Sequence, residues 1–285
     1  MVPDGRKIRR LLEDAVDTLE TGHEVPLNEV RDLFKNTPKT WGFVGGMFIG
    51  GNDDGIALRF LHGKQYEPMT RNLWRLLCKD AELVADIGAH TGTFTLDAWN
   101  SGAKFVFSAE PHPINYSRLV LNLRYNGFPC GGVMYGAMGD VDKIDMLLVK
   151  QMFLCHAAGR VGMHNVNGHE LPVRVHRMDT LIEEEFWPTL KVVKIDAENY
   201  TLNTLVGMGK ILNHKPDLIL ECTQTGMTEV LKPLGYRFWN IWETGKIEEV
   251  EDLTPYNPGN NYNGTDEDCR NRFCSVKGLP DGLQA

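Results

Sequence analysis

The sequence predicts an α/β fold in which a mostly parallel sheet carries helices on both faces. Three observations lead to this prediction. From residue 83 onward, short apolar segments alternate with segments whose apolar residues recur at helical spacing. The segment LKVVKID (residues 190–196) is typical of a buried strand, and the turn DIGAHTGTF (residues 86–94) follows the first strand. Because parallel strands need a crossover connection, usually a helix, this alternation is typical of a parallel sheet.

The predicted core spans residues 81–250. Helices are expected over residues 91–99, 113–125, 179–186 and 200–212. The clearest of them is 113–125, where apolar residues recur on one face. The strand YRFWNIW is expected at the edge of the sheet. The expected strands are LVADI, KFVFSAE, GGVMYGAM, IDMLLV, LPVRVHRM, LKVVKID, DLILEC and YRFWNIW.

Two flanking regions differ from this core. Helical spacing predicts helices over residues 7–20, 27–34 and 68–79, and turn residues NDD between WGFVGGMFIG and GIALRFLHG predict a β-hairpin. Residues 1–80 are therefore expected to form a helical and hairpin cap. Residues 251–285 are rich in Pro, Asn and Gly, which favours an irregular tail or lid.

Composition excludes several classes of protein. Hydrophobic residues make up 42% and charged residues 24% of the 285 residues, as in ordinary globular proteins. The net charge of −8 argues against nucleic acid as the main partner. We see no signal-peptide pattern and no apolar run long enough for a membrane span. We therefore expect a cytoplasmic protein without membrane contact, whose six cysteines form no disulfides.

The turn DIGAHTGTF has the composition of a ligand-binding loop. In open α/β sheets, ligands bind beyond the carboxyl ends of the strands. Gly88 and Gly92 allow the backbone to approach a ligand closely. The third glycine of the dinucleotide fingerprint is missing, and Asp86 would repel a diphosphate but suit a cationic ligand. Glu110, at the end of the next strand, suits the ribose hydroxyls of either kind of cofactor, so Asp86 and the glycine spacing favour S-adenosylmethionine.

Several blocks carry a resemblance to a known family. VADIGAHTGTFTLDAW, FSAEPHPINYSRLVLNLRYNG, VHRMDTL, VVKIDAENYTLNTLVGM and DLILECT follow one another in the order found in FkbM methyltransferases. The chain resembles this family over about residues 64 to 240. The resemblance implies a Rossmann-like class I methyltransferase fold. It also implies S-adenosylmethionine as cofactor and S-adenosylhomocysteine as product, with acceptors among natural products, sugars and peptides.

The resemblance also implies roles for individual residues. Asp86, Gly88 and Gly92 would hold the methionine end of the cofactor, Glu110 the ribose, and Asp196 would face the transferable methyl group. The expected cofactor-binding residues are Asp86, Gly88, Ala89, His90, Gly92, Glu110, Pro111, Gly136, Ala137 and Asp196. This chain departs from the family pattern in that His90 and His112 replace asparagines, and Asn199 and Thr201 replace a glycine and a glutamate.

The expected catalytic residues are Asp196, Glu198 and Glu221. Asp196 would take a proton from a hydroxyl acceptor, or else it merely orients the acceptor or the cofactor. Glu198 would share a proton with Asp196, or else it caps the following helix. Glu221 ends an apolar strand, where an unpaired carboxylate is costly.

No metal is expected. His156, His164 and His169 are too widely spaced in a loop, and Cys269 and Cys274 lack further ligands at zinc spacing. The loop 151–170 is instead expected to help shape the acceptor pocket.

The expected function is methyl transfer to a hydroxyl of a small molecule or sugar. Methylation of an amine or amide of a small molecule or peptide is the alternative. Two other classes stay open at this point: a nucleotide-dependent oxidoreductase, which the missing glycine disfavours, and a binding module that keeps the fold without catalysis.

Overall fold

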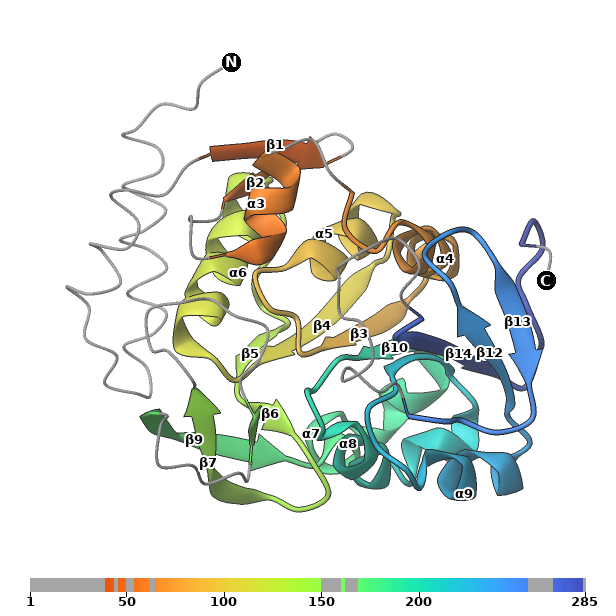
Figure 1. Cartoon of the computed structure of the whole chain (residues 1–285). Helices are drawn as coiled ribbons and strands as arrows, with labels where there is room; N and C mark the ends of the chain where they lie inside the picture. The colour runs from red at the N-terminus through yellow and green to blue at the C-terminus, as the bar shows by residue number, and fades with distance from the viewer. Residues whose placement is uncertain are drawn as a thin grey trace.

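The structure is a computed structural model of the chain (Figure 1). The residues it describes are 39–43, 46–49, 54–61, 65–149, 160–161, 169–255 and 269–283. The helices expected over residues 7–20 and 27–34 and most of the loop 151–170, with His156 and His164, lie outside these ranges. Within them, no helix has both the length and the hydropathy to cross a membrane.

An eight-stranded sheet forms the centre of the molecule, in the order β13-β12-β14-β11-β10-β3-β4-β5. The five neighbours from β11 to β5 are parallel, which confirms the mostly parallel sheet predicted from sequence. The bounds are β3 Leu83–Ile87, β4 Phe105–Glu110, β5 Val133–Tyr135, β10 Leu190–Ile195, β11 Asp217–Glu221, β12 Arg237–Ile241, β13 Ile247–Val250 and β14 Asn271–Ser275.

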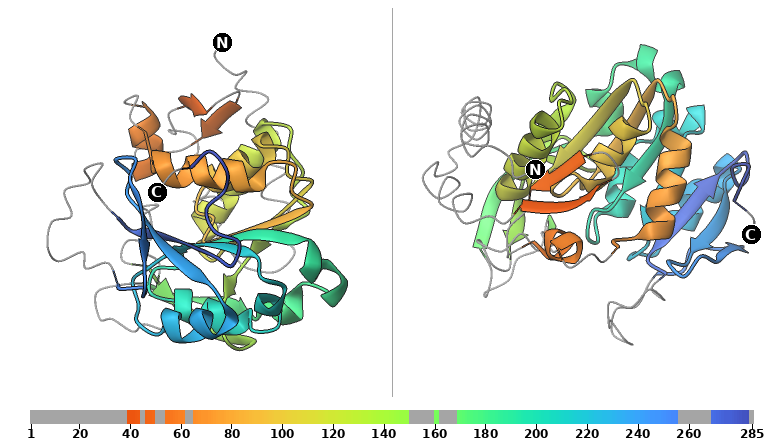
Figure 2. Two further views of the ribbon diagram at one scale, coloured as in Figure 1. Left: turned by 90° about the vertical axis from the view of Figure 1, so that its right-hand side faces the viewer. Right: turned by 90° about the horizontal axis from the view of Figure 1, so that it is seen from above.

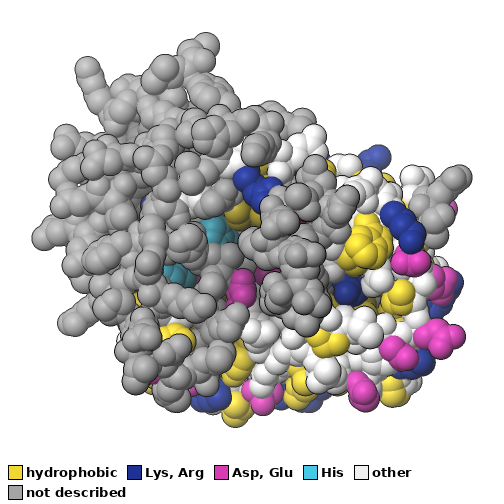
Figure 3. Space-filling view, viewed as in Figure 1, with side chains coloured by type: hydrophobic (Ala, Val, Ile, Leu, Met, Phe, Trp, Pro, Cys, Tyr) yellow, Lys and Arg dark blue, Asp and Glu magenta, His cyan; other side chains and the backbone are white. Residues whose placement is uncertain are grey.

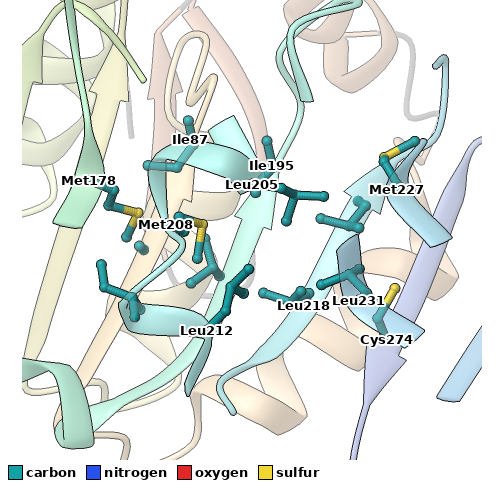
Figure 4. Packing of buried hydrophobic residues seen from close by; sticks show 14 of the residues in the cluster. Ile87, Met178, Ile195, Leu205, Met208, Leu212, Leu218, Met227, Leu231 and Cys274 are labelled. Carbon is teal, nitrogen blue, oxygen red and sulfur yellow. The ribbon is translucent and has the colours of Figure 1, made fainter. Parts of the chain in front are cut away.

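Helices cover both faces of this sheet. Side chains alternate between the faces along each strand, so Val84 and Val192 contact the cluster under α4 and α5, whereas Ala85 and Val193 contact the cluster under α8 and α9. The second cluster is shown in Figure 4, and the view from above in Figure 2 shows α4, α5 and α6 over the first face. The bounds are α4 Pro68–Cys78, α5 Thr93–Asn100, α6 Pro113–Tyr125, α7 Met178–Leu181, α8 Thr201–Gly207 and α9 Met227–Leu231.

Two of these helices begin as their sequences predict. Pro68 and Pro113 occupy the first turns of α4 and α6, where a missing backbone N–H costs nothing. His112 caps α6, because its Nδ1 accepts a hydrogen bond from the Asn115 backbone N–H at 3.5 Å. A histidine thus performs at this position the capping that asparagine usually performs.

A second sheet follows β5 in the chain. It has the order β6-β9-β7-β8, with bounds β6 Ala137–Met138, β7 Lys143–Val149, β8 Arg160–Val161 and β9 His169–His176. Only Gly136 separates β5 from β6. The second sheet packs its apolar side chains, among them Leu147 and Val175, against Tyr200 just before α8.

The predicted hairpin is wrong in its second half. The two strands are β1 Lys39–Phe43 and β2 Gly46–Ile49, and GIALRFL forms helix α3 (Gly55–Leu61). The reason is a helix cap, because Asp54 Oδ1 accepts hydrogen bonds from the backbone N–H groups of Ile56 and Ala57 at 2.9 and 3.1 Å. The turn residues therefore begin a helix instead of closing a hairpin.

The two later helices are shorter than expected. The stretch 200–212 contains α8 and then a separate 3₁₀ helix, Ile211–His214, and the stretch 179–186 contains α7 and part of the 3₁₀ helix Glu184–Thr189. A further 3₁₀ helix, Lys232–Leu234, follows α9. α8 ends at Gly207, where a Cβ would lie 1.8 Å from the carbonyl oxygen of Gly139.

The prediction of an irregular tail is wrong at residues 271–275. This segment is strand β14, which lies between β11 and β12 and is antiparallel to both, so that YRFWNIW is internal and β13 forms the edge. The strand was not predicted because its polar residues break the apolar pattern of a buried strand. These residues are hydrogen-bonded in the structure: the Ser275 hydroxyl donates to Asp217 at 2.6 Å, and the Arg272 guanidinium donates to the Cys269 carbonyl at 2.8 Å. The division at residues 80 and 250 stays a proposal.

Candidate functional site

A cavity lies at the carboxyl ends of β3, β4 and β10. Its empty volume is about 710 Å³, including space that opens to solvent. Acidic and histidine side chains lie near one another toward the middle of the face shown in Figure 3. The predicted cofactor residues that line the cavity are Gly88, His90, Glu110, Pro111, Gly136 and Ala137. Asp196 and Glu198 line it from the end of β10, so the fold brings together eight of the predicted site residues.

Glu110 is held in place by the backbone. Its Oε2 accepts from the N–H of His90 and its Oε1 from the N–H of His112, both at 2.8 Å. Burial raises the pKa of Glu110, although His90 and the two backbone N–H groups oppose the increase. The Asn115 side chain also forms a hydrogen bond with this carboxylate, and the acceptor capacity that remains can receive a hydroxyl group.

The turn after β3 brings two strands into contact. Gly88 has φ +77°, and a Cβ there would lie 1.8 Å from the Asp196 carbonyl oxygen. The glycine therefore allows the ends of β3 and β10 to approach each other directly below the cavity. His90 has φ +52°, a conformation that asparagine and histidine adopt more readily than most residues, which explains how histidine replaces the usual asparagine.

Four predicted residues do not line the cavity. Asp86 is fully buried and accepts a 2.6 Å hydrogen bond from the Thr95 hydroxyl on α5, so its expected direct contact with the cofactor is not supported. Gly92, with φ +97°, precedes α5 and lies against Leu119. Ala89 packs in a small apolar cluster, and Glu221 is buried.

The carboxyl groups of Asp196, Glu198 and Glu221 form an acidic group at one side of the cavity. Their oxygen atoms lie within 4.8 Å of one another. Burial alone would raise the pKa of Asp196, but the Lys194 ammonium, 2.9 Å from Asp196 Oδ2, and Arg270 together hold it below its ordinary value. Asp196 is therefore the ionised member of the group.

Glu221 behaves in the opposite way. Burial, and next the carboxylates of Asp196 and Glu198, raise the pKa of Glu221 well above its ordinary value. Its Oε2 is buried without a hydrogen-bond partner among the described residues. The acidic group therefore contains one carboxyl that stays ionised and one that retains a proton readily.

Glu198 occupies an unusual backbone position. Glu198 and Asn199 have φ +45° and φ +69°, both in the left-handed region. Asparagine adopts this conformation more easily than other side chains, which explains how Asn199 replaces the glycine of the family pattern. α8 begins at Thr201. The backbone N–H of Leu202 in its first turn donates a hydrogen bond to Gln224 Oε1 at 2.9 Å.

Sequence reasoning missed four residues near the acidic group: Tyr66, Glu67, Lys194 and Arg270. Tyr66 lines the cavity, and Glu67 just before α4 interacts electrostatically with Lys194 and Asp196. Arg270, just before β14, faces Asp196 and Glu221. Only Lys194 had a sequence signal, because it interrupts an otherwise apolar buried strand; the others come from segments far away in the chain.

The wall of the cavity fits S-adenosylmethionine better than a dinucleotide. Its described residues include Glu110, Asp196 and Glu198 but neither Lys nor Arg. At Glu110 a diphosphate would meet a carboxylate with no Lys or Arg among the residues that line the cavity, whereas a sulfonium or ammonium group would be stabilised. Glu110 would hold the ribose, and the Asp196 side would face the sulfonium.

The acidic group also resembles the carboxylate clusters that hold divalent cations. Here Lys194 and Arg270 already face it, so much of its charge is balanced by the chain itself. We therefore treat the three carboxyls as an ion-paired group.

Comparisons with known proteins identify a family. Residues 86–250 match the model of the methyltransferase FkbM domain. Similar solved structures include a SAM-dependent methyltransferase from Agrobacterium tumefaciens (13% identity, 85% of this chain and 70% of that chain covered, TM-score 0.44). Others are M. jannaschii TYW2 in complex with AdoMet (13%, 84% and 83%, 0.40) and an rRNA methylase from Streptococcus thermophilus (12%, 72% and 92%, 0.38). No curated protein matches the sequence.

Proposed function

The chain belongs to the FkbM family of methyltransferases and is an S-adenosylmethionine-dependent enzyme, and on this premise we propose that it methylates a hydroxyl group of a small molecule or sugar. The cofactor supplies the methyl group from its sulfonium. The chain's own residues must then hold the cofactor, orient the acceptor and remove the acceptor's proton. The oxidoreductase and the non-catalytic module considered from sequence are set aside by the family.

The acidic group supports a hydroxyl acceptor. A hydroxyl loses its proton as its oxygen bonds to the methyl carbon and the carbon–sulfur bond breaks, so it needs a base. Asp196 faces the cavity in ionised form and can orient the hydroxyl and receive its proton. A low pKa makes Asp196 a weak base, so it takes up the hydroxyl proton only as the new oxygen–carbon bond forms. Glu221, whose pKa is raised, retains its own proton readily and forms a side-chain hydrogen bond with Asp196. We therefore assign base function to Asp196.

The same charges disfavour an amine. Carboxylates raise the pKa of a neighbouring amine, because they stabilise its ammonium form. An ammonium has no lone pair with which to attack a methyl group. Methylation of an amine therefore lacks a supporting feature in this site, whereas methylation of an amide, the other form of the alternative considered from sequence, is not affected by this argument.

The net charge of −8 supports the absence of a nucleic-acid partner, since phosphates are repelled by a negatively charged protein. The cytoplasmic location predicted from sequence is kept as part of this proposal.

The test is a transfer assay with methyl-labelled S-adenosylmethionine. Sugars and polyols, amines of matched size and short RNAs are offered separately to the purified protein. We expect label only in hydroxyl acceptors, with the rate falling about 10²- to 10⁴-fold in Asp196→Asn. Asp252→Asn, at an exposed ion pair with Lys232, should leave the rate unchanged. Transfer only to amines or RNA would contradict the proposal.

A further inference from the structure

Lys194 has no assigned role, although it is among the most deeply buried side chains of the protein. Its exposed fraction is 2%, and lysine is almost never buried to this extent unless it is paired. Lys191 on the same strand is exposed. The Lys194 ammonium lies 2.9 Å from Asp196 Oδ2 and 4.2 Å from the centre of the Phe94 ring. Both contacts stabilise a positive charge at this point.

A row of polar residues crosses the sheet beside Lys194. In the strand register, Ser108 on β4 is opposite Asp86 on β3, and Asp86 is opposite Lys194 on β10. The Thr95 hydroxyl on α5 contacts Asp86 Oδ2 at 2.6 Å and Ser108 Oγ at 3.0 Å. Asp86 is thereby fixed next to the lysine, behind the wall of the cavity.

Burial and the neighbouring carboxylates act on the pKa of Lys194 in opposite directions. Burial would lower the pKa of Lys194, but Asp196, Asp86 and Glu67 outweigh it and the pKa is raised. The ammonium therefore stays charged and favours the ionised form of Asp196, whereas at Asp86 and Glu67 it only opposes the rise in pKa that burial causes. The charged groups that act on Asp196 or on this lysine come from five places: Asp86 on β3, Lys194 on β10, Glu67 before α4, Arg270 before β14, and Glu221 with Glu198 at the neighbouring strand ends.

We propose that Lys194 is a positioning residue for methyl transfer: its ammonium holds the Asp196 carboxylate ionised and fixed at the edge of the cavity, and Asp86 acts on the site through this lysine. The inference rests on the proposed function, because it gives Asp196 the task of receiving the acceptor. It also gives a role to Asp86, which does not line the cavity but lies beside Lys194 in the strand register.

A purely structural role of Lys194 would not require its positive charge. Replacing a buried ion pair by apolar groups of similar size is often neutral for stability, so packing alone does not require a lysine here. The distinguishing quantity is the pKa of Asp196, which packing would not set.

The test measures that pKa directly. Protein labelled with ¹³C at the aspartate carboxyl carbons is titrated by NMR, and Asp196→Asn assigns the signal. In Lys194→Met we expect the pKa of Asp196 to rise by about 1 to 3, the usual effect of losing an adjacent cation. Lys104→Met, which removes an exposed lysine paired with Glu82, is the matched control and should leave the signal unchanged. An unchanged pKa in Lys194→Met would overturn the proposal.

Two further variants keep the test independent of folding. The double change Asp86→Asn with Lys194→Met removes one charge of each sign, and it should raise the pKa of Asp196 in the same direction. In Asp86→Asn alone, the Lys194 ammonium no longer interacts with a second carboxylate, so its effect on Asp196 is stronger and the pKa of Asp196 should fall. A rise would overturn the proposed role of Asp86.

Kinetics and binding separate this inference from the proposed function. With a hydroxyl acceptor in hand, Lys194→Met should move the acid limb of kcat to higher pH, and Lys194→Arg should restore it in part. S-adenosylhomocysteine binding by the unmodified protein tests the function itself. Binding without a pKa change in Lys194→Met defeats only the positioning role, whereas no binding defeats the function.

Discussion

The two sides of the cavity are built in different ways. The side that we propose binds the cofactor, here called the cofactor side, is made mainly by backbone, with Gly88, His90 and Glu110 lying within 23 residues of one another along the chain (110 − 88 + 1). The side that we propose receives the acceptor, here called the acceptor side, is made by charged side chains, with Glu67, Lys194, Glu221 and Arg270 drawn from segments up to 203 residues apart (270 − 67). Local geometry therefore determines one side, and long-range electrostatics determines the other.

This difference has a consequence for substitutions. On the cofactor side, a residue contributes through its conformation and its hydrogen bonds, so substitutions that add atoms or remove a hydrogen bond should lower stability or cofactor affinity. On the acceptor side, a residue contributes through its charge, so changes of protonation should alter stability or activity. Four predictions test whether the two sides respond in these two ways.

The largest effect is expected for Gly88→Ala. The new Cβ would lie 1.8 Å from the Asp196 carbonyl oxygen at a left-handed position, so we expect a loss of about 3 kcal/mol or more in the free energy of unfolding. Urea unfolding measures it. Gly127→Ala is the matched control, because Gly127 has φ +80° with nothing within 4 Å, and it should lose only about 1–2 kcal/mol. Equal losses would show that close approach of β3 and β10 is unimportant.

The next effect concerns Glu110→Gln. Glutamine can accept only one of the two backbone hydrogen bonds and loses the charge, so S-adenosylhomocysteine affinity should fall about 10- to 100-fold. Calorimetric titration measures it. Glu82→Gln, at the exposed pair with Lys104, should bind like the unmodified protein. An unchanged affinity in Glu110→Gln would remove the ribose contact from the account.

A smaller effect is expected from pH at Glu243, whose carboxylate accepts hydrogen bonds from the Met69 N–H and the Thr70 hydroxyl at the start of α4. Burial, and next Glu67, raise the pKa of Glu243 to about 7, so the folded state retains a proton that the unfolded chain releases near 4.5. The stabilisation is complete below the unfolded value and is lost as the pH rises toward the folded one. The free energy of unfolding should fall from about pH 5 to about pH 8, and less steeply in Glu243→Gln.

Denaturant titrations at several pH values measure this slope. The exposed Glu251→Gln serves as the control, with the slope of the unmodified protein. A slope in Glu243→Gln as steep as in the unmodified protein would show that Glu243 is not the titrating group.

The smallest effect concerns Asn199, where the acceptor side does depend on backbone. At φ +69°, Asn199→Gly should leave stability nearly unchanged, whereas Asn199→Ala should cost about 1–2 kcal/mol. Thermal unfolding of the pair measures the difference. A glycine variant less stable than the alanine variant would show that the asparagine side chain, and not its conformation, is required.

The same contrast explains what could be predicted from sequence. The alternating sheet and the residues Gly88, Glu110 and Asp196 were predictable, because strand ends and turn glycines are readable along a short stretch. Asp86 was assigned to the cavity from its place near a strand end, but strand alternation directs it to the face covered by α5. Strand β14 and Arg270 were not predictable, because polar side chains satisfied by distant partners leave no apolar pattern. The prediction of the hairpin's second strand was wrong because Asp54, one of the turn residues NDD, caps helix α3.

The most direct test of the account is calorimetric titration of the purified protein with S-adenosylhomocysteine, run beside NADH and with Glu110→Gln as the second sample. The account predicts binding of S-adenosylhomocysteine but not of NADH, with a clear loss in Glu110→Gln. Binding of NADH in preference, or equal binding of S-adenosylhomocysteine by both proteins, would contradict the assignment of this cavity to the cofactor.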